Sequence, residues 1–122
     1  MLIKICGLTR GVDVAAAVRA GADTLGFVFA PGSKRVLETQ RAAELVAQVP
    51  AFVTRTGLFM DQEAASVERI IARVPLNLLQ FHGNESADFC RQFGLPYIKA
   101  VSMTAERAVE QAERDYTDAA AL

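Results

Sequence analysis

The strongest constraint on this chain is a regular alternation between short apolar runs and stretches with helical periodicity. One run and one helical stretch together take about 20–30 residues, the size of a β-strand followed by an α-helix. The runs are rich in branched and aromatic residues, and several are apolar on both faces, as in a covered parallel sheet. They open near Leu2, Thr24, Val53, Asn77, Pro96 and Ala119. This alternation predicts an α/β fold of parallel strands with right-handed crossovers, in a barrel or a doubly wound sheet.

The elements can be placed approximately from the same pattern. Strands are expected near residues 2–6, 24–29, 53–59, 77–81 and 96–101, and residues 119–122 resemble the opening of a sixth. Apolar residues at i, i+3, i+4 and i+7 predict helices over three sets: Ala42, Leu45, Val46 and Val49; Val67, Ile70, Ile71 and Val74; Ala105, Ala108, Val109 and Ala112. Candidate N-caps are Asp61, Ser86 and Thr104, and candidate C-caps are Gly21 and Gly94.

Composition excludes several classes of protein. The 122 residues include 13 basic and 14 acidic side chains, so nothing favours a nucleic acid or an anionic membrane as partner. No apolar run approaches the roughly twenty residues of a membrane span, and the amino terminus has no signal-peptide pattern. Two cysteines do not suggest a disulfide framework. We therefore expect one cytoplasmic domain over residues 1–122.

Polar residues gather where the predicted strands end. Cys6 follows the first strand, residues 33–35 (Ser-Lys-Arg) follow the second, Asp61 follows the third, and Gln80 and His82 lie at the end of the fourth. Barrels and doubly wound sheets both bind ligands at the carboxyl ends of their strands. No Gly-x-Gly-x-x-Gly motif follows the first strand, which disfavours a dinucleotide site. The pattern favours a barrel with its site at this end.

Cys6 is the first candidate for chemistry. Strand alternation places Lys4 and Cys6 on the same face, and a nearby ammonium favours the thiolate form of a cysteine. The alternative is that Cys6 is a small buried hydrophobe, as unpaired cysteines often are.

Three further residues have ordinary explanations as well as functional ones. Arg35 could hold a carboxylate bidentately, or belong with Lys34 to a solvated loop. His82, the single histidine, could line a pocket or be a satisfied structural side chain. It has no companion at metal-ligand spacing, so no metal site is expected. Cys90 lies on the apolar stripe of a helix and should be inert core.

Four segments, taken together, resemble phosphoribosylanthranilate isomerase, a (β/α)8 barrel of tryptophan biosynthesis. They are residues 4–9 (KICGLT), residues 26–29 (GFVF) followed by 33–35 (SKR), residues 79–85 (LQFHGNE) and residues 97–100 (YIKA). They occur in the family's order and spacing across the chain. The resemblance implies a TIM barrel, of which this chain would form about the first five β/α units and the start of strand six.

The resemblance also implies a reaction and roles for particular residues. The family catalyses an Amadori rearrangement, in which an acid opens the ribose ring and a base removes the proton from the neighbouring carbon. Cys6 matches the base, Arg35 matches the contact to the anthranilate carboxylate, and His82 with Gln80 would line the substrate pocket. The substrate is a small phosphorylated sugar–anthranilate compound, and no cofactor is implied.

The family's chains are longer, at roughly two hundred residues. Its catalytic aspartate and phosphate-binding loops would lie beyond residue 122, and Asp118 is expected at the opposite end from the site, a poor substitute. Two alternatives follow: an inactive barrel fragment that acts only in folding or association, and another small-sugar-phosphate barrel. If the chain does end at Leu122, we expect self-association through its open strand edges or partial melting, without isomerase activity.

Two lysines need partners. Lys4 and Lys99 are embedded in apolar strands and are expected to contribute to the same kind of interior barrel layer. A buried ammonium requires a partner, which could come from later strands or from bound substrate.

Overall fold

The computed structural model describes residues 1–104 and 106–122. Over these residues five strands alternate with five helices, and the strands lie within the ranges expected from the sequence. In chain order the elements are β1 Lys4–Cys6, α1 Gly11–Arg19, β2 Thr24–Val28, α2 Thr39–Val46, β3 Thr54–Phe59, α3 Ala64–Ile71, β4 Leu78–Phe81, α4 Ala87–Arg91, β5 Tyr97–Lys99 and α5 Ala108–Asp115.

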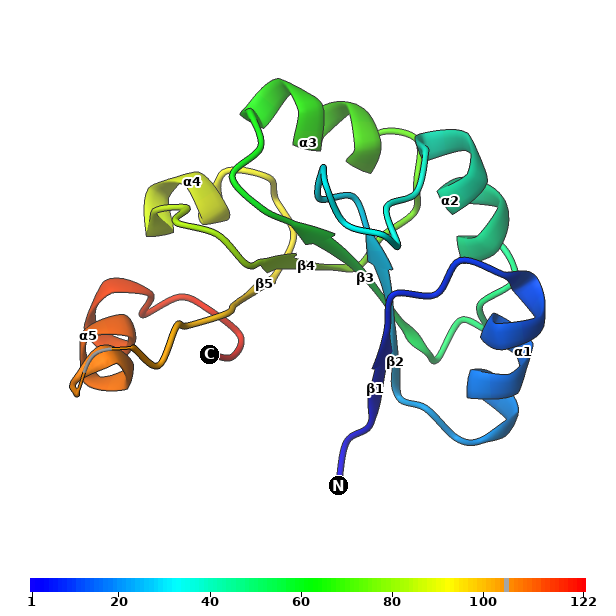
Figure 1. Ribbon diagram of the computed structural model, residues 1–122, viewed down its shortest axis with the longest axis horizontal. Helices are drawn as coiled ribbons and strands as arrows, with labels where there is room; N and C mark the ends of the chain where they lie inside the picture. The colour runs from blue at the N-terminus through cyan, green and yellow to red at the C-terminus, as the bar shows by residue number, and fades with distance from the viewer. Residues whose placement is uncertain (105) are drawn as a thin grey trace.

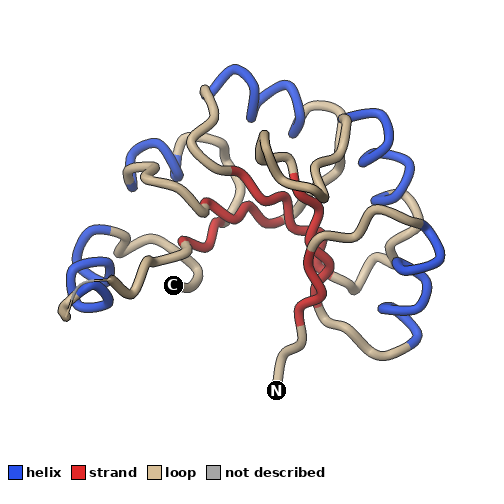
Figure 2. The backbone as a smooth tube through the Cα atoms, viewed as in Figure 1, coloured by secondary structure: helices blue, strands red, loops and turns tan. Residues whose placement is uncertain are grey.

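The strands form one parallel sheet in the order β1-β2-β3-β4-β5. The sheet curves, and the helices follow one another along its convex side (Figures 1 and 2). Covering by helices on one side matches a partial barrel and rules out the doubly wound alternative. Ala121 forms an isolated parallel bridge with Ile98, as expected for the opening of another strand beside β5.

The core lies between the convex face of the sheet and the helices. By register, Leu25, Phe27, Phe59, Leu79 and Phe81 lie on the same face of β2, β3 and β4, and all five are completely buried. The Phe59 and Phe81 ring centroids lie 6.0 Å apart, a spacing typical of aromatic pairs. This packing fixes the face that each strand presents to the helices, and therefore which residues line the concave face.

Register identifies the residues of the concave face. Cys6 pairs with Gly26, Gly26 with Thr56, and Leu58 with Gln80, and partners in a parallel ladder point to the same side. Along β1 the side chain of Lys4 joins this face by alternation. The carboxyl ends of the strands thus bring Cys6 and Gln80 to one surface of the curved sheet.

Two of the three candidate N-caps are wrong. Ser86 caps α4, and its hydroxyl oxygen accepts from the Phe89 N–H at 3.2 Å. Asp61 does not cap α3, because its carboxylate accepts from the Asn84 N–H instead. Thr104 does not cap α5, since its hydroxyl oxygen accepts from Ser102, and the helix begins at Ala108. Ala105, expected to open this helix, lies outside the described residues.

Gly21 ends α1 close to where it was expected to, although the C-cap itself is Ala20 and Gly21 is the residue after it. The φ of Gly21, 84°, is left-handed. The N–H of Ala22 then bonds the carbonyl oxygen of Ala17 at 3.1 Å, which closes the helix before β2 begins. Gly94 also has a positive φ, of 70°, two residues beyond the α4 C-cap.

Among the described residues, no helix is long and apolar enough to cross a membrane.

Candidate functional site

Cys6 ends β1 and rests on a glycine of the neighbouring strand. A Cβ atom built on Gly26 would lie 2.7 Å from Cys6 Sγ, so the thiol occupies the space that a side chain at position 26 would fill. Cys6 is half-buried. The thiol is therefore located by the sheet itself and keeps a partly open side on the concave face.

The loop after β2 brings Arg35 beside Cys6. Arg35 Nη1 donates to the Cys6 carbonyl oxygen at 3.0 Å. The guanidinium group lies over Gly7, where a Cβ atom would be 2.4 Å from Nη1. Gly7 also has a φ of 82°, so glycine suits this position in two ways. Arg35 is exposed, and the described residues supply its guanidinium with no other hydrogen-bond acceptor. A planar donor fork thus stands beside the backbone of Cys6.

Gln80 joins the same surface from the far side of the curve. The Lys4 ammonium donates a hydrogen bond to Gln80 Oε1, which links β1 to β4 across the concave face. Both side chains are half-buried. The partner of Lys4 is therefore a residue of β4, and not a later strand or a bound substrate as expected from the sequence.

Lys99 corrects the expectation that it shares an interior barrel layer with Lys4. It pairs in register with Phe81, whose side chain packs under the helices, so Lys99 faces the convex side. Its ammonium donates to the carbonyl oxygens of Gly83 and Ala100, at 2.6 and 2.9 Å. Glu85 Oε2 lies 3.9 Å away and supplies the opposite charge. Neither a bound ligand nor a further strand is needed to satisfy this lysine.

His82 lies at a different part of the same end of the sheet. It is exposed, directly follows β4, and lines a pocket of about 330 Å³ that also includes Met60, Lys99 and Ser102. The backbone N–H of His82 donates to the Phe59 carbonyl oxygen at 2.9 Å, which holds the His82 backbone at the end of β3. Within the described chain, no hydrogen bond joins this pocket to the pair formed by Cys6 and Arg35.

Asp118 lies at the opposite end of the sheet, as expected. Its carboxylate accepts from the Tyr97 hydroxyl at 2.5 Å and from Arg91 Nε at 2.9 Å. Tyr97 is the first residue of β5, so this carboxylate is at the amino ends of the strands. The Tyr97 hydrogen bond, followed by that of Arg91, lowers the pKa of Asp118 below its ordinary value. A low pKa and a remote position both argue against a role as the acid.

Cys90 is buried core, as expected. It is completely inaccessible, and burial, together with the nearby Glu85 carboxylate, raises the pKa of its thiol to about 12. Among the residues that the structure describes, no three histidine, cysteine or acidic side chains are grouped to hold a metal ion.

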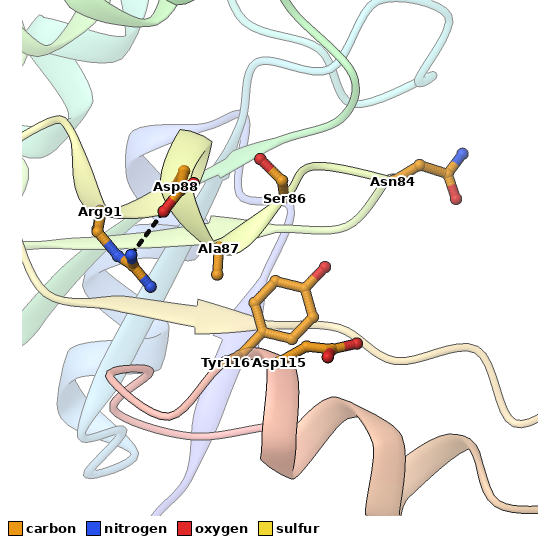
Figure 3. Close-up of a pocket in the computed structure, with 7 residues that line it drawn as sticks. All are labelled: Asn84, Ser86, Ala87, Asp88, Arg91, Asp115 and Tyr116. Atoms are coloured by element: carbon orange, nitrogen blue, oxygen red, sulfur yellow. Dashed lines mark hydrogen bonds and ion pairs between the residues drawn. The ribbon is translucent and has the colours of Figure 1, made fainter.

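A second pocket, of about 480 Å³, lies on the convex side between α4 and the end of α5 (Figure 3). It is lined by Asn84, Ser86, Ala87, Asp88, Arg91, Asp115 and Tyr116. The positively charged side chain in this lining, Arg91, already forms ion pairs: its Nη1 lies 2.6 Å from Asp88 Oδ1, and it also contacts Asp118. None of the residues singled out from the sequence as site residues lies in this pocket.

Sequence reasoning missed Glu85. It reads as a polar loop residue in HGNE, yet it is 6% exposed, and both carboxylate oxygens accept backbone N–H bonds. No periodicity in the sequence marks a loop glutamate as buried. Its place at the end of the LQFHGNE segment, three residues after His82, is the signal that could have drawn attention to it.

Comparisons with known proteins agree with this architecture. A model of the N-(5'-phosphoribosyl)anthranilate (PRA) isomerase family matches residues 3–122. The isomerase of that name from Acidithiobacillus ferrooxidans is 48% identical over 120 residues, which are 98% of this chain and 58% of that protein. The one from Neisseria meningitidis serogroup C is 44% identical over 119 residues, 98% of this chain and 57% of that protein.

Solved structures of the same family also superpose on this chain. Phosphoribosylanthranilate isomerase from Thermotoga maritima superposes with a TM-score of 0.92 at 36% identity, covering 99% of this chain and 60% of that one. A second such structure, in complex with reduced 1-(o-carboxyphenylamino)-1-deoxyribulose 5-phosphate, has a TM-score of 0.87 at 37% identity and covers 93% and 60%. The chain thus spans less than two thirds of the length of these relatives.

Proposed function

Because the chain belongs to the N-(5'-phosphoribosyl)anthranilate isomerase family, we propose that the full-length protein carries out the family's reaction. This is the Amadori rearrangement of N-(5-phosphoribosyl)anthranilate to 1-(2-carboxyphenylamino)-1-deoxyribulose 5-phosphate in tryptophan biosynthesis. One observation carries the proposal: the Cys6 thiol rests on Gly26 at the carboxyl end of β1, and the Arg35 guanidinium is hydrogen-bonded to the backbone carbonyl of the same cysteine. Residues 1–122 form one segment of the barrel, and a biosynthetic role of this kind fits the cytoplasm.

We assign the base to Cys6. In the reaction, an acid protonates the ribose ring oxygen and the C1–O bond breaks, which leaves an iminium at C1. The Cys6 thiolate then takes the proton from C2, the C2–H electron pair forms the C1–C2 double bond, and the C1–N π pair returns to nitrogen, which gives an enolamine. Protonation at C1 and loss of the C2 hydroxyl proton then give the ketone at C2. A thiolate is suited to this transfer because its pKa can lie near the working pH. None of the described residues is assigned the role of the acid.

Arg35 would hold the anthranilate carboxylate. Its guanidinium is exposed next to Cys6, and a planar donor fork matches the two oxygens of a carboxylate. We place Gln80 and His82 on the substrate's other side, because both lie on the surface formed by the end of β4. The relative solved with a reduced product-like ligand supports a phosphorylated sugar–anthranilate substrate of this class.

The alternative is that residues 1–122 serve only as an inactive association module. It is favoured by the exposure of the first strand: Ile5 in β1 is 39% exposed and Ile3, just before it, is 40% exposed, and within the described chain β1 pairs with β2 alone. Such an edge favours pairing with another chain.

A turnover assay in deuterated water separates the two possibilities. Substrate and product are isomers of equal mass, so chromatography must resolve them. Abstraction at C2 followed by protonation at C1 places a solvent deuterium on C1 of the product, which mass spectrometry then detects. Full-length protein that forms no ketose product would exclude the isomerase function and leave the association module.

A further inference from the structure

A buried ion pair lies behind the loop that carries His82. The side chains of Glu85 and Lys99 are 3% and 5% exposed, and Lys99 Nζ lies 3.9 Å from Glu85 Oε2. The Lys99 ammonium also lies 5.6 Å from the centroid of the Tyr116 ring. Charges this deeply buried are stable only when their remaining hydrogen-bonding capacity is satisfied. The partners that satisfy them therefore show what the pair holds in place.

Those partners are the backbones of two neighbouring loops. Glu85 Oε1 accepts from the Asp61 N–H at 2.7 Å, and Glu85 Oε2 accepts from the Gly83 N–H at 2.8 Å. Asp61 follows β3 and Gly83 follows β4, so one carboxylate binds both loops. From the other side, Lys99 Nζ donates to the Gly83 carbonyl oxygen at 2.6 Å. Both polar groups of the Gly83 backbone are thus held by the pair.

The two loops also fit each other closely. Asp61 Oδ1 accepts from the Asn84 N–H at 2.6 Å, and Asp61 adopts a left-handed φ of 50°, which is uncommon outside glycine. A Cβ atom on Gly83 would lie 2.4 Å from the Asp61 carboxylate. A fit this tight leaves the loops little freedom to shift independently.

His82 directly precedes Gly83 and lines a pocket with Ala100, Val101 and Ser102. We propose that Glu85, with Lys99 as its counter-ion, is a positioning residue that sets where His82 stands in this pocket. The consequence for turnover rests on the proposed function, whereas the consequence for the location of His82 does not.

The first test is Glu85→Gln in the full-length protein. Glutamine keeps the shape but loses the charge, and its amide nitrogen cannot accept one of the two backbone N–H bonds. We expect the His82 imidazole proton signals in the NMR spectrum to shift or broaden, and kcat/KM to fall on the order of 10–100-fold. His82→Gln assigns the signals by their loss. Glu63→Gln, at an exposed position before α3, is the matched control and should change neither readout.

Kinetics then distinguish positioning from general support of the fold. If Glu85 acts through His82, adding Glu85→Gln to His82→Gln should cost little more than His82→Gln alone. In the double variant Glu85→Gln/Lys99→Met, no unpaired charge remains buried, so stability should recover while the His82 signals stay displaced. Losses that add fully in the His82→Gln background would overturn the proposal.

The double variant is the test of Glu85 if Glu85→Gln alone does not fold, and a surface variant tests the contact between the two loops separately. Asp61 is exposed; Asp61→Ala removes the acceptor for the Asn84 N–H, whereas Asp61→Asn keeps it. We expect Asp61→Ala alone to displace the His82 signals. Signals at their wild-type positions in folded Glu85→Gln, or in the double variant Glu85→Gln/Lys99→Met, overturn the proposal. An inactive wild-type protein would refute the proposed function, and the NMR readout would still decide the role of Glu85.

Discussion

At the scale of single residues, two glycines determine where the two main candidate side chains, those of Cys6 and Arg35, can lie. Gly26 leaves room for the Cys6 thiol, and Gly7 leaves room for the Arg35 guanidinium, which then reaches the carbonyl oxygen of Cys6. Position, more than an unusual residue type, therefore distinguishes Cys6 from Cys90. The first is half-buried on the concave face, and the second is on the buried face of α4.

Exchanging the two cysteines for alanine should give opposite results in the full-length protein. Cys6→Ala removes the proposed base from a half-open position, so turnover should fall about 10²–10⁴-fold while stability changes by less than about 1 kcal/mol. Cys90→Ala leaves a small cavity and should cost about 1 kcal/mol with turnover retained. Steady-state kinetics and urea unfolding measure both. Near-normal turnover in Cys6→Ala would show that another group is the base.

Arg35→Lys tests recognition of the carboxylate. A lysine is a point charge and cannot reproduce the donor fork, so KM should rise on the order of tenfold with kcat little changed. Lys34→Met, one residue earlier and also exposed, is the control for charge loss in the same loop. The effect should shrink for a substrate analogue without the ring carboxylate. Equal losses on both substrates would show that Arg35 does not contact that group.

Cys90 should also make stability fall in alkali. Burial, aided by the Glu85 carboxylate, raises its pKa from the ordinary 9.0 to about 12. A raised pKa means that the folded state holds the proton more tightly, so this contribution is complete below pH 9.0 and is lost progressively towards about 12. Urea unfolding of wild type and Cys90→Ala at several pH values should show the stability gap between them narrowing as pH rises. A constant gap would contradict the raised pKa.

At the scale of elements, the strands were predictable and the sides of individual residues were not. The alternation of apolar runs with helical periodicity predicts all five described strands. Each run is conspicuous in the sequence because a strand that is buried on both faces needs apolar residues at successive positions. In such strands alternation no longer indicates which face a residue occupies, and Lys99 was therefore assigned to the wrong side. The cap at Asp61 failed because a tertiary contact to Asn84 took the carboxylate. Likewise, the buried Glu85 depends on two loops meeting, which no local pattern encodes.

The contact between β1 and β2 can be tested by adding one carbon. Gly26→Ala would place its Cβ atom 2.7 Å from Cys6 Sγ and 3.2 Å from Cys6 Cα, so the thiol must move. We expect turnover to fall well over tenfold and stability by about 1–3 kcal/mol. Gly57→Ala is the matched control, because its Cβ atom would meet Leu76 Cδ1 at 2.5 Å in the core. It should destabilise similarly but keep turnover per folded molecule. Equal turnover losses in both would contradict a specific contact at Cys6.

At the scale of the whole molecule, the curved sheet has a helix-covered convex side and strand edges that differ in exposure. β5 is bridged by Ala121 along its outer side, whereas β1 pairs with β2 alone in the described part of the chain. Ile3 and Ile5 of this first segment are 40% and 39% exposed. In a closed barrel every strand has two neighbours, so an edge of this kind is not exposed.

Residues 1–122 prepared alone should therefore self-associate or stay partly molten, and should not isomerise the substrate. Unpaired backbone groups along an apolar edge favour pairing with another copy, and a charge on that edge opposes it. Ile5→Lys is the matched variant and should shift sedimentation towards the monomer, while a variant of the covered side such as Val67→Ala should not. Sedimentation velocity combined with the turnover assay measures both expectations. A stable monomer of 13.2 kDa that forms the ketose product would contradict them, because the thiol, the guanidinium and the His82 pocket would then suffice for catalysis.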